Sequence, residues 1–286
     1  MHSISLASAA LVLAVSSAFA ADGHFDRTLT ANPGTNLVVE TGSGYIHVTP
    51  GNDNQLHISA QVHGNRGWMG GGDVEARIRQ IVANPPVHQS GNNVTVGESG
   101  HGLADVFRNI SIDYEIQAPR NMTVHASTGS GDVQVQDSGP NSSLTSGSGS
   151  IRANNLHGAV VLQSGSGDIQ MQQSTPGDVK AQTGSGSIRI NGFAGGLHAQ
   201  TGSGDIQVEG HPTGEWKLET GSGSIRLGVG NDAHFTVDGD TGSGTIHVSQ
   251  PITMQGNIGK NHVHGIVNGG GPLIKAFTGS GDVEIH

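Results

Sequence analysis

Histidine and carboxylate side chains are the groups in this chain that could bind a transition metal, because the 286-residue sequence has 16 histidines and no cysteine. His262 and His264 flank Val263, and side chains alternate along a strand, so both imidazoles would lie on one strand face. A metal site needs at least one further protein ligand. None is evident beside this pair, and we therefore expect solvent-exposed strand histidines and no metal-binding residue.

The phrase Gly-Ser-Gly-Asp, for example at 202–205, raises calcium binding as an alternative. Calcium-binding β-helix repeats have the pattern Gly-Gly-x-Gly-x-Asp and short periods. Here the aspartate follows the glycine directly, and alternate copies of the phrase carry serine in its place. We favour corner hydrogen bonding over calcium binding; a melting temperature that calcium and chelators leave unchanged would dismiss calcium.

Catalysis is the next chemistry to consider. The many Gly-x-Gly pairs precede strands, whereas a nucleotide-binding loop needs a following helix. Polysaccharide-cleaving enzymes can have a β-helical fold, but they need a clustered acid–base set, and here the acidic residues are evenly spaced and aromatic residues make up only 3% of the chain. We therefore expect that the protein is not an enzyme and that it has no catalytic residues, no cofactor-binding residues and no cofactor.

The sequence is organised around a repeated phrase, Thr/Ser-Gly-Ser-Gly. It occurs nine times, and the first glycines of the copies are Gly42, Gly129, Gly147, Gly165, Gly184, Gly202, Gly221, Gly242 and Gly279. From Gly129 to Gly221 the steps are 18 or 19 residues, and the last step is 37 residues. A fixed period of this size indicates stacked structural repeats.

Apolar residues alternate with polar ones on both sides of each glycine phrase. In the copy at Gly202, Leu197 and Ala199 precede the phrase, and Ile206 and Val208 follow it. This period of two predicts a strand on each side, with one face buried. Each repeat is then strand, corner, strand and variable turn, and we expect the corner glycines to supply positive φ.

We therefore predict an all-β fold, a parallel β-solenoid with about 18–19 residues and two main strands per coil. A right-handed coil is expected from the handedness of parallel crossovers. A left-handed helix with three short faces is the alternative, although its six-residue apolar repeat is not evident.

Outward positions also follow the repeat. Copies with Asp-x-Gln alternate with copies that carry Ser-x-Arg, from Asp132 and Gln134 to Ser224 and Arg226. Stacking would place each arginine beside acidic residues of the adjacent coil and would keep like charges apart. We interpret the alternation as a means of holding the register, and the threonines and serines of the phrase as hydroxyl ladders along one corner.

Residues 1–20 have the pattern of a secretory signal peptide, with an apolar run at 6–15 and Ala18-Phe19-Ala20 before the expected cleavage site. Residues 21–286 are expected to form one β-solenoid domain. Within it, 21–120 is an irregular N-terminal part with a capping helix near 73–83, and 121–286 is the regular repeat array. The last strand, 282–286, is expected to be an uncovered edge, with Asp282 and Glu284 guarding it by charge.

The formal net charge of −10 argues against nucleic acid or an anionic membrane as a partner. No segment of the mature chain is long and apolar enough to span a membrane.

Two stretches resemble a known family. They are Ile110–Arg120 followed by Thr128-Gly129-Ser130-Gly131-Asp132-Val133, and Gly265–Pro272 followed by Thr278-Gly279-Ser280-Gly281-Asp282-Val283. Together they are similar to the bacterial β-strand-repeat domains known as putative adhesins, a family of unknown function. The resemblance implies an exported β-helical protein of the periplasm, outer-membrane surface or extracellular space, and it supplies no functional residues.

We expect a non-enzymatic binding protein whose partner is a protein or glycan of the cell surface or envelope. A periplasmic scaffold without a ligand is the alternative, followed by a polysaccharide-active enzyme.

Overall fold

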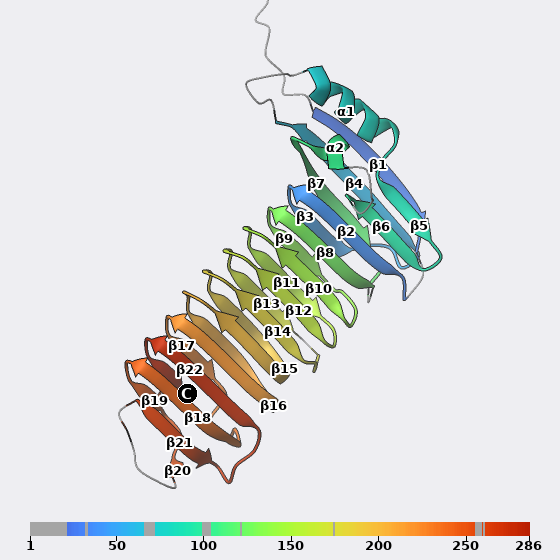
Figure 1. Cartoon of the computed structure of the whole chain (residues 1–286). Coiled ribbons are helices and arrows are strands. Elements are labelled where there is room, and N and C mark those ends of the chain that lie inside the picture. The colour runs from blue at the N-terminus through green and yellow to red at the C-terminus, as the bar shows by residue number, and fades with distance from the viewer. Residues whose placement is uncertain are drawn as a thin grey trace, which may run out of the picture.

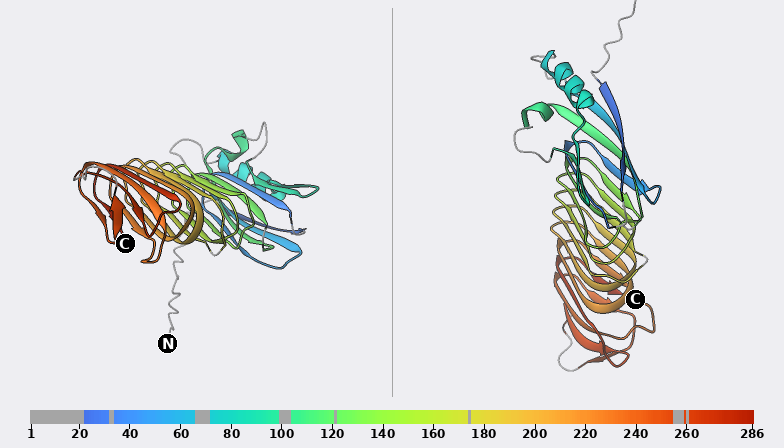
Figure 2. Two further views of the ribbon diagram at one scale, coloured as in Figure 1. Left: turned by 90° about the horizontal axis from the view of Figure 1, so that it is seen from below. Right: turned by 90° about the vertical axis from the view of Figure 1, so that its right-hand side faces the viewer.

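The computed structural model describes residues 22–31, 34–65, 72–98, 104–120, 122–173, 175–254, 259 and 261–286. Over these residues the chain forms 23 strands in one continuous sheet that coils on itself, and two helices. The coils stack into an elongated rod (Figure 1). The views in Figure 2 show a flattened coil with an N-terminal layer at one end.

Each regular coil has one strand before the glycine corner and one after it. The strands before the corner are β2 (Asn36–Ser43), β8 (Thr123–Ser130), β10 (Ser142–Ser146), β12 (Val160–Ser164), β14 (Val179–Thr183), β18 (Phe235–Ser243) and β22 (Leu273–Ser280). The strands after it are β3 (Ile46–Pro50), β9 (Val133–Gln136), β11 (Ile151–Leu156), β13 (Ile169–Gln173), β17 (Ile225–Gly228), β19 (Ile246–Val248) and β23 (Val283–Ile285). β15 (Ile188–Thr201) and β16 (Ile206–Ser222) each join the second strand of one coil to the first strand of the next.

Equivalent residues of adjacent coils pair in parallel register. Ile169 pairs with Ile188, which pairs in turn with Ile206 and then with Ile225. These side chains are fully buried in the space between the two strand layers. The predicted parallel β-solenoid with two strands per coil is therefore confirmed.

Trp216 occupies an inward position, as its place in the repeat predicts. Its side chain is fully buried, its Nε1 donates a hydrogen bond of 2.9 Å to the carbonyl oxygen of Gly195, and its ring centroid lies 5.8 Å from that of Phe193. The indole is thus a core residue with its polar atom satisfied.

The expectation that the corner glycines supply positive φ is wrong for most coils. Among the corner glycines, positive φ is found at Gly44, Gly223, Gly244 and Gly281. The common requirement is space: a Cβ atom on Gly149 would lie 1.9 Å from the carbonyl oxygen of Gly131 in the adjacent coil. Glycine is needed because the corner backbones stack too closely for any side chain.

The hydroxyl group that precedes each corner glycine forms a buried ladder. From the second regular coil onward it donates to the carbonyl oxygen of the second corner glycine of the neighbouring coil, over 2.8–2.9 Å. The donors are Thr128, Ser146, Ser164, Thr183, Thr201, Thr220, Thr241 and Thr278. These carbonyls are thereby satisfied at a corner where the strand ladder is interrupted.

The aspartate–serine alternation has a similar local cause. The Oδ1 atom of Asp132 accepts a hydrogen bond of 2.8 Å from the backbone N–H of Ser150 in the next coil, and Asp168 and Asp205 make the same bond to Ser187 and Ser224. One carboxylate thus serves two coils. The predicted arginine pairs are present at Arg152–Asp132, 3.4 Å, and Arg226–Asp205, 3.7 Å. Arg189 makes no ion pair within the described residues.

The N-terminal end is closed by antiparallel strands and a helix. β1 (Asp22–Thr30) pairs with β4 (Gln55–Gly64), β4 pairs with β7 (Ile110–Ala118), and β5 (Val87–Ser90) pairs with β6 (Asn93–Gly97). The predicted helix is present as α1 (Gly72–Ala83), which packs against β1 and β4, and a short α2 (Ala104–Phe107) follows. β1 was not predicted as a strand of its own.

The C-terminal end differs from the sequence prediction. The strand predicted to be an uncovered edge, β23, lies between β17 and β19, and β22 lies between β16 and β18. The last strand pair of the chain is thus inserted between two coils that precede it in sequence. The 37-residue step between glycine phrases contains two further strands, β20 (Ile252–Met254) and β21 (His262–Val267), which close this end in antiparallel pairing with each other and with β18.

Candidate functional site

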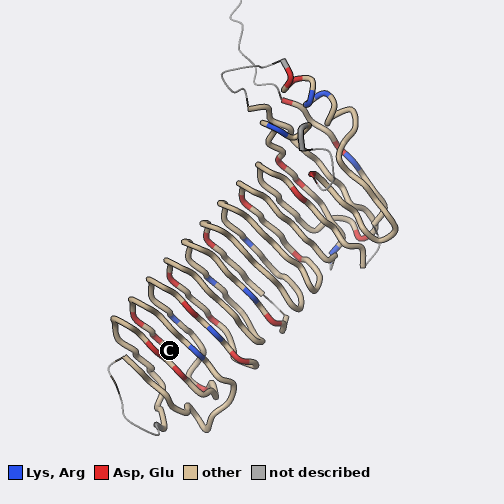
Figure 3. Tube along the Cα trace, in the orientation of Figure 1, with Lys and Arg blue, Asp and Glu red and all other residues tan. Residues whose placement is uncertain are grey.

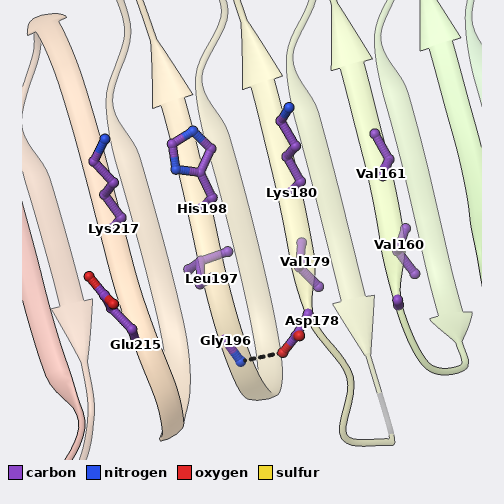
Figure 4. Close-up of a pocket in the computed structure, with 11 residues that line it drawn as sticks. Val160, Val161, Asp178, Val179, Lys180, Gly196, Leu197, His198, Glu215 and Lys217 are labelled. Atoms are coloured by element: carbon purple, nitrogen blue, oxygen red, sulfur yellow. Dashed lines mark hydrogen bonds between the residues drawn. The ribbon is translucent and has the colours of Figure 1, made fainter.

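A shallow groove crosses the outer face of β12, β14, β15 and β16. It has a volume of about 530 Å³ and its floor is largely apolar, with Val161, Val179 and Leu197 among the lining residues. Figure 4 shows these residues on adjacent strands, so the groove runs along the axis of the rod and across the strands.

Two of the residues that line the groove are small. Ala159 and Gly196 carry little or no side chain at the turn that begins these strands. Asp178 bends toward the backbone, and its Oδ1 accepts a hydrogen bond of 3.0 Å from the N–H of Gly196. A Cβ atom on Gly196 would lie 2.9 Å from that oxygen, so a larger residue there would displace the Asp178 carboxylate.

A row of basic side chains borders the groove. Lys180, His198, Lys217 and Lys275 occupy equivalent outward positions in four successive coils, and each pairs in register with the next. The first three lie side by side in Figure 4. We call these four residues the lysine row.

The basic side chains of the lysine row differ in their ion-pair partners. Lys217 Nζ lies 2.9 Å from Glu219 Oε1, and Lys275 Nζ lies 3.0 Å from Glu215 Oε1. Lys180 and His198 have neither an ion pair nor a side-chain hydrogen bond with any residue that the structure describes.

A second polar row lies two residues further along the same strands. Gln163 Nε2 donates to Gln182 Oε1 over 3.3 Å, and Gln182 Nε2 donates to Gln200 Oε1 over 3.0 Å. These glutamines border a smaller depression of about 330 Å³. The two hollows together extend over most of the strand length of this face. Their polar lining residues include the three glutamines, Lys180, His198 and Lys217, and the carboxylates of Asp178 and Glu215.

Charge follows rows on the rest of the solenoid as well (Figure 3). On the other strand layer, the arginine positions alternate with glutamine from coil to coil, from Gln134 and Arg152 to Gln207 and Arg226. The lysine row departs from this rule because Lys217 and Lys275 are direct neighbours. Like charges that face each other across paired strands are destabilising.

The sequence prediction contained no site residues, and it missed the lysine row, which the repeat encodes only in part. All four residues lie four positions before a first corner glycine, namely Gly184, Gly202, Gly221 and Gly279. In sequence order, however, the same position of the copy at Gly242 is Asp238, which interrupts the run of basic residues. Lys275 lies beside Lys217 only because β22 is inserted between β16 and β18.

The sequence candidates lie elsewhere. His262 and His264 are exposed on β21, at the C-terminal end. The aspartates of the calcium alternative each accept, through one carboxylate oxygen, a hydrogen bond from a backbone N–H at the corner, as described above.

Neither described helix could cross a bilayer, since both are too short and too polar for a membrane span.

The sequence model of the Toastrack DUF4097 family matches residues 34–286. Comparison with curated protein sequences finds no match. Among solved structures, the chain is similar to a putative adhesin from Bacteroides fragilis, with 15% identity, a TM-score of 0.47, and coverage of 92% of this chain and 97% of that chain. It is also similar to a putative cell adhesion protein from Clostridium sporogenes, with 9% identity, a TM-score of 0.23, and coverage of 92% and 98%. Similarities at this level carry no information on ligand or activity.

Proposed function

Because the chain belongs to the Toastrack DUF4097 family, we propose that it is an exported, non-enzymatic binding protein of the bacterial cell surface. Its binding face is the grooved layer of β12, β14, β15 and β16, and its partner is an extended, negatively charged envelope polymer such as an acidic glycan. The lysine row is the observation that carries this proposal.

The lysine row supports binding because the fold does not need it. The net charge of the chain is −10, and elsewhere the solenoid separates like charges. Two adjacent lysines, Lys217 and Lys275, cost stability, and local departures from otherwise consistent rules are typical of functional positions. Neighbouring coils are spaced by about 4.8 Å, so the row offers regularly spaced basic side chains to a linear polyanion.

The ion pairs of Lys217 and Lys275 do not prevent such binding. Both lysines are about half exposed, with 45% of each side chain accessible. Exposed pairs are worth about 0–1 kcal/mol, so a carboxylate or phosphate of the partner can replace Glu219 or Glu215 at little cost.

Binding is tested with the triple variant Lys180→Ala, His198→Ala and Lys217→Ala, measured against acidic and neutral glycans on an array and then by calorimetry. Three charge contacts of about 0.5–1 kcal/mol each predict roughly a 10- to 100-fold loss of affinity for the acidic ligands. The matched control replaces Arg152, Arg189 and Arg226 on the other strand layer and should bind as the original protein does. Equal loss in both variants, or no acidic ligand at all, would contradict the proposed face.

Surface location is tested separately by protease treatment of intact cells, with lysed cells as the control. Digestion on intact cells supports a surface-binding role. Protection until lysis would place the protein in the periplasm and favour the alternative, a structural scaffold. That alternative is supported by one feature of the fold, namely that antiparallel strands close both ends of the rod without any ligand.

A further inference from the structure

At the C-terminal end, two aspartates and two histidines share one exposed face. β18 and β21 pair in antiparallel register, with Asp238 opposite His264 and Asp240 opposite His262. The residues between them, such as Gly239 and Val263, face inward and are buried, so these four side chains point outward together.

The side-chain atoms are already close to one another. His262 Nδ1 lies 2.8 Å from Asp240 Oδ1, and His264 Nδ1 lies 3.6 Å from Asp238 Oδ1. One potential ligand atom from each of Asp238, Asp240 and His262 lies within 4.8 Å of the other two. Among the described residues this is the one group of three or more metal-ligating side chains that is so closely spaced.

We propose that Asp238, Asp240, His262 and His264 form a binding site for a divalent transition-metal ion of the zinc type. Imidazole nitrogen and carboxylate oxygen bind Zn²⁺ at about 2.0–2.2 Å, so two ligands of one ion are at most about 4.4 Å apart. The three closest groups meet this limit after side-chain shifts of under about 1 Å, which exposed side chains make readily. The mixed set of two imidazoles and two carboxylates favours zinc over calcium, which prefers oxygen ligands throughout.

The charges around the cluster favour a cation. Asp238 and Asp240 are two residues apart on the same face, so their negative charges repel each other. The nearest lysine in the register, Lys275, is opposite Asp238 on β22, but its Nζ is bonded to Glu215. On the same side, Asp240 is opposite the exposed ring of Phe277, which offers no charge.

An ion at this position would join the end of the rod to its body. β18 belongs to the last parallel coil, whereas β21 is an antiparallel strand that closes the end. A metal ion that binds only the folded arrangement stabilises it by an amount that grows with the logarithm of the ion concentration once that concentration exceeds the Kd. The site would therefore act as a clamp on the C-terminal cap. It lies outside the groove but next to the end of the lysine row, because Asp238 is opposite Lys275.

The site is tested with the full, untagged chain, titrated with ZnCl₂ in a calorimeter and monitored for thermal unfolding, with CaCl₂ in parallel. We expect one zinc ion per chain with micromolar affinity and a rise of the melting temperature by a few degrees, and no such effect of calcium. Co²⁺ should give visible absorption of a four-coordinate site, which reports the ligands directly.

The decisive comparison uses the double variant His262→Ala and His264→Ala and, separately, Asp240→Asn. Both should bind zinc at least tenfold more weakly while keeping the far-ultraviolet circular dichroism of the original chain, since all three residues are exposed. The matched control is His24→Ala, which removes a histidine of similar exposure whose Nε2 lies 2.6 Å from Asp26 Oδ2, and it should bind zinc normally. Absence of saturable zinc binding, unchanged affinity in the double variant, or an equal effect of calcium would overturn the proposal.

Discussion

At the scale of single residues, the corner of each coil shows how closely this fold packs its backbone. The corner glycines stack on one another, and a methyl group at most of them would meet a carbonyl oxygen of the adjacent coil at 1.9–2.6 Å. The buried hydroxyl before the glycines and the aspartate after them satisfy backbone groups that the strand ladders leave free. The recurring phrase is therefore a packing and hydrogen-bonding unit.

Replacement of Gly149 by alanine tests this explanation. The new Cβ atom would lie 1.9 Å from the carbonyl oxygen of Gly131, so the two coils must move apart. We expect a loss of at least about 2 kcal/mol in the free energy of unfolding, as is usual when a tightly packed site is overfilled. Urea unfolding measures this loss of stability. The control is Ser148→Ala, at the exposed position between the two glycines, which should change stability by less than about 0.5 kcal/mol. Similar stability of both variants would contradict close stacking as the reason for glycine.

The carboxyl group of Asp282 predicts a dependence of stability on pH. Hydrogen bonds from the backbone N–H and the hydroxyl of Thr245 hold the pKa of Asp282 below its usual value. A group whose pKa is lower in the folded state stabilises the fold above its unfolded pKa, near 4, and loses that effect as the pH falls through the folded pKa.

The variant Asp282→Asn isolates this contribution. The original chain should be more stable than the variant at pH 6, and the difference should shrink as thermal unfolding is measured at successively lower pH values down to 3. A difference that stays constant over this range would show that ionisation of Asp282 does not contribute.

At the scale of elements, the helix α1 protects the N-terminal edge. Ile78 is 4% exposed, and a Cβ atom on Gly23 of β1 would lie 2.6 Å from Ile78 Cγ2, so the helix rests directly on that strand. The apolar face of α1 is formed by Val74, Ile78 and Ile81, in the spacing that the sequence predicts for a helix. Covering a strand in this way limits edge-to-edge association.

Substitution of Ile78 by aspartate should detach this cover. A charged side chain at a buried apolar position costs about 3 kcal/mol or more, and the helix would leave β1 exposed. We expect a lower melting temperature together with soluble oligomers in sedimentation experiments. The control Gln80→Asp places the same charge on the exposed face of α1 and should keep the melting temperature and the sedimentation of the original chain. If both variants behave alike, α1 does not protect the edge of β1.

At the scale of the whole molecule, the order of coils in space departs from their order in sequence. The pair β22–β23 separates the coil of β16–β17 from that of β18–β19, so the end of the chain lies inside the stack. The outermost described strands at this end of the rod are therefore β19, β20 and β21, and end-to-end association at this end would start at these strands rather than at the C-terminal strand.

Removal of residues 272–286 tests this order. The shortened chain lacks β22 and β23, which leaves the strands on both sides without partners, and open strand edges promote association. We expect aggregation of the shortened chain, whereas a C-terminal strand lying on the outside would be removable with a monomer remaining. Sedimentation of both chains at equal concentration distinguishes these outcomes.

The sequence alone determined the elements that depend on local pattern. The period of two on each side of the glycine phrase predicts which residues face inward, including Trp216, and the fixed step between phrases predicts stacked parallel coils. The helix α1 follows from its apolar spacing and from the prolines after it. These features are readable because each depends on residues a few positions apart.

Only the tertiary structure decided which coils and strands are neighbours. The insertion of β22–β23, the antiparallel pairing of β21 with β18, and hence the meeting of Asp240 with His262 all join segments that no repeat relates. Alternation assigns a side chain to a face, but the residues beside it on that face depend on long-range pairing and register. For the same reason the groove could not be seen in the sequence, since its lining residues come from four coils that meet only in the folded chain.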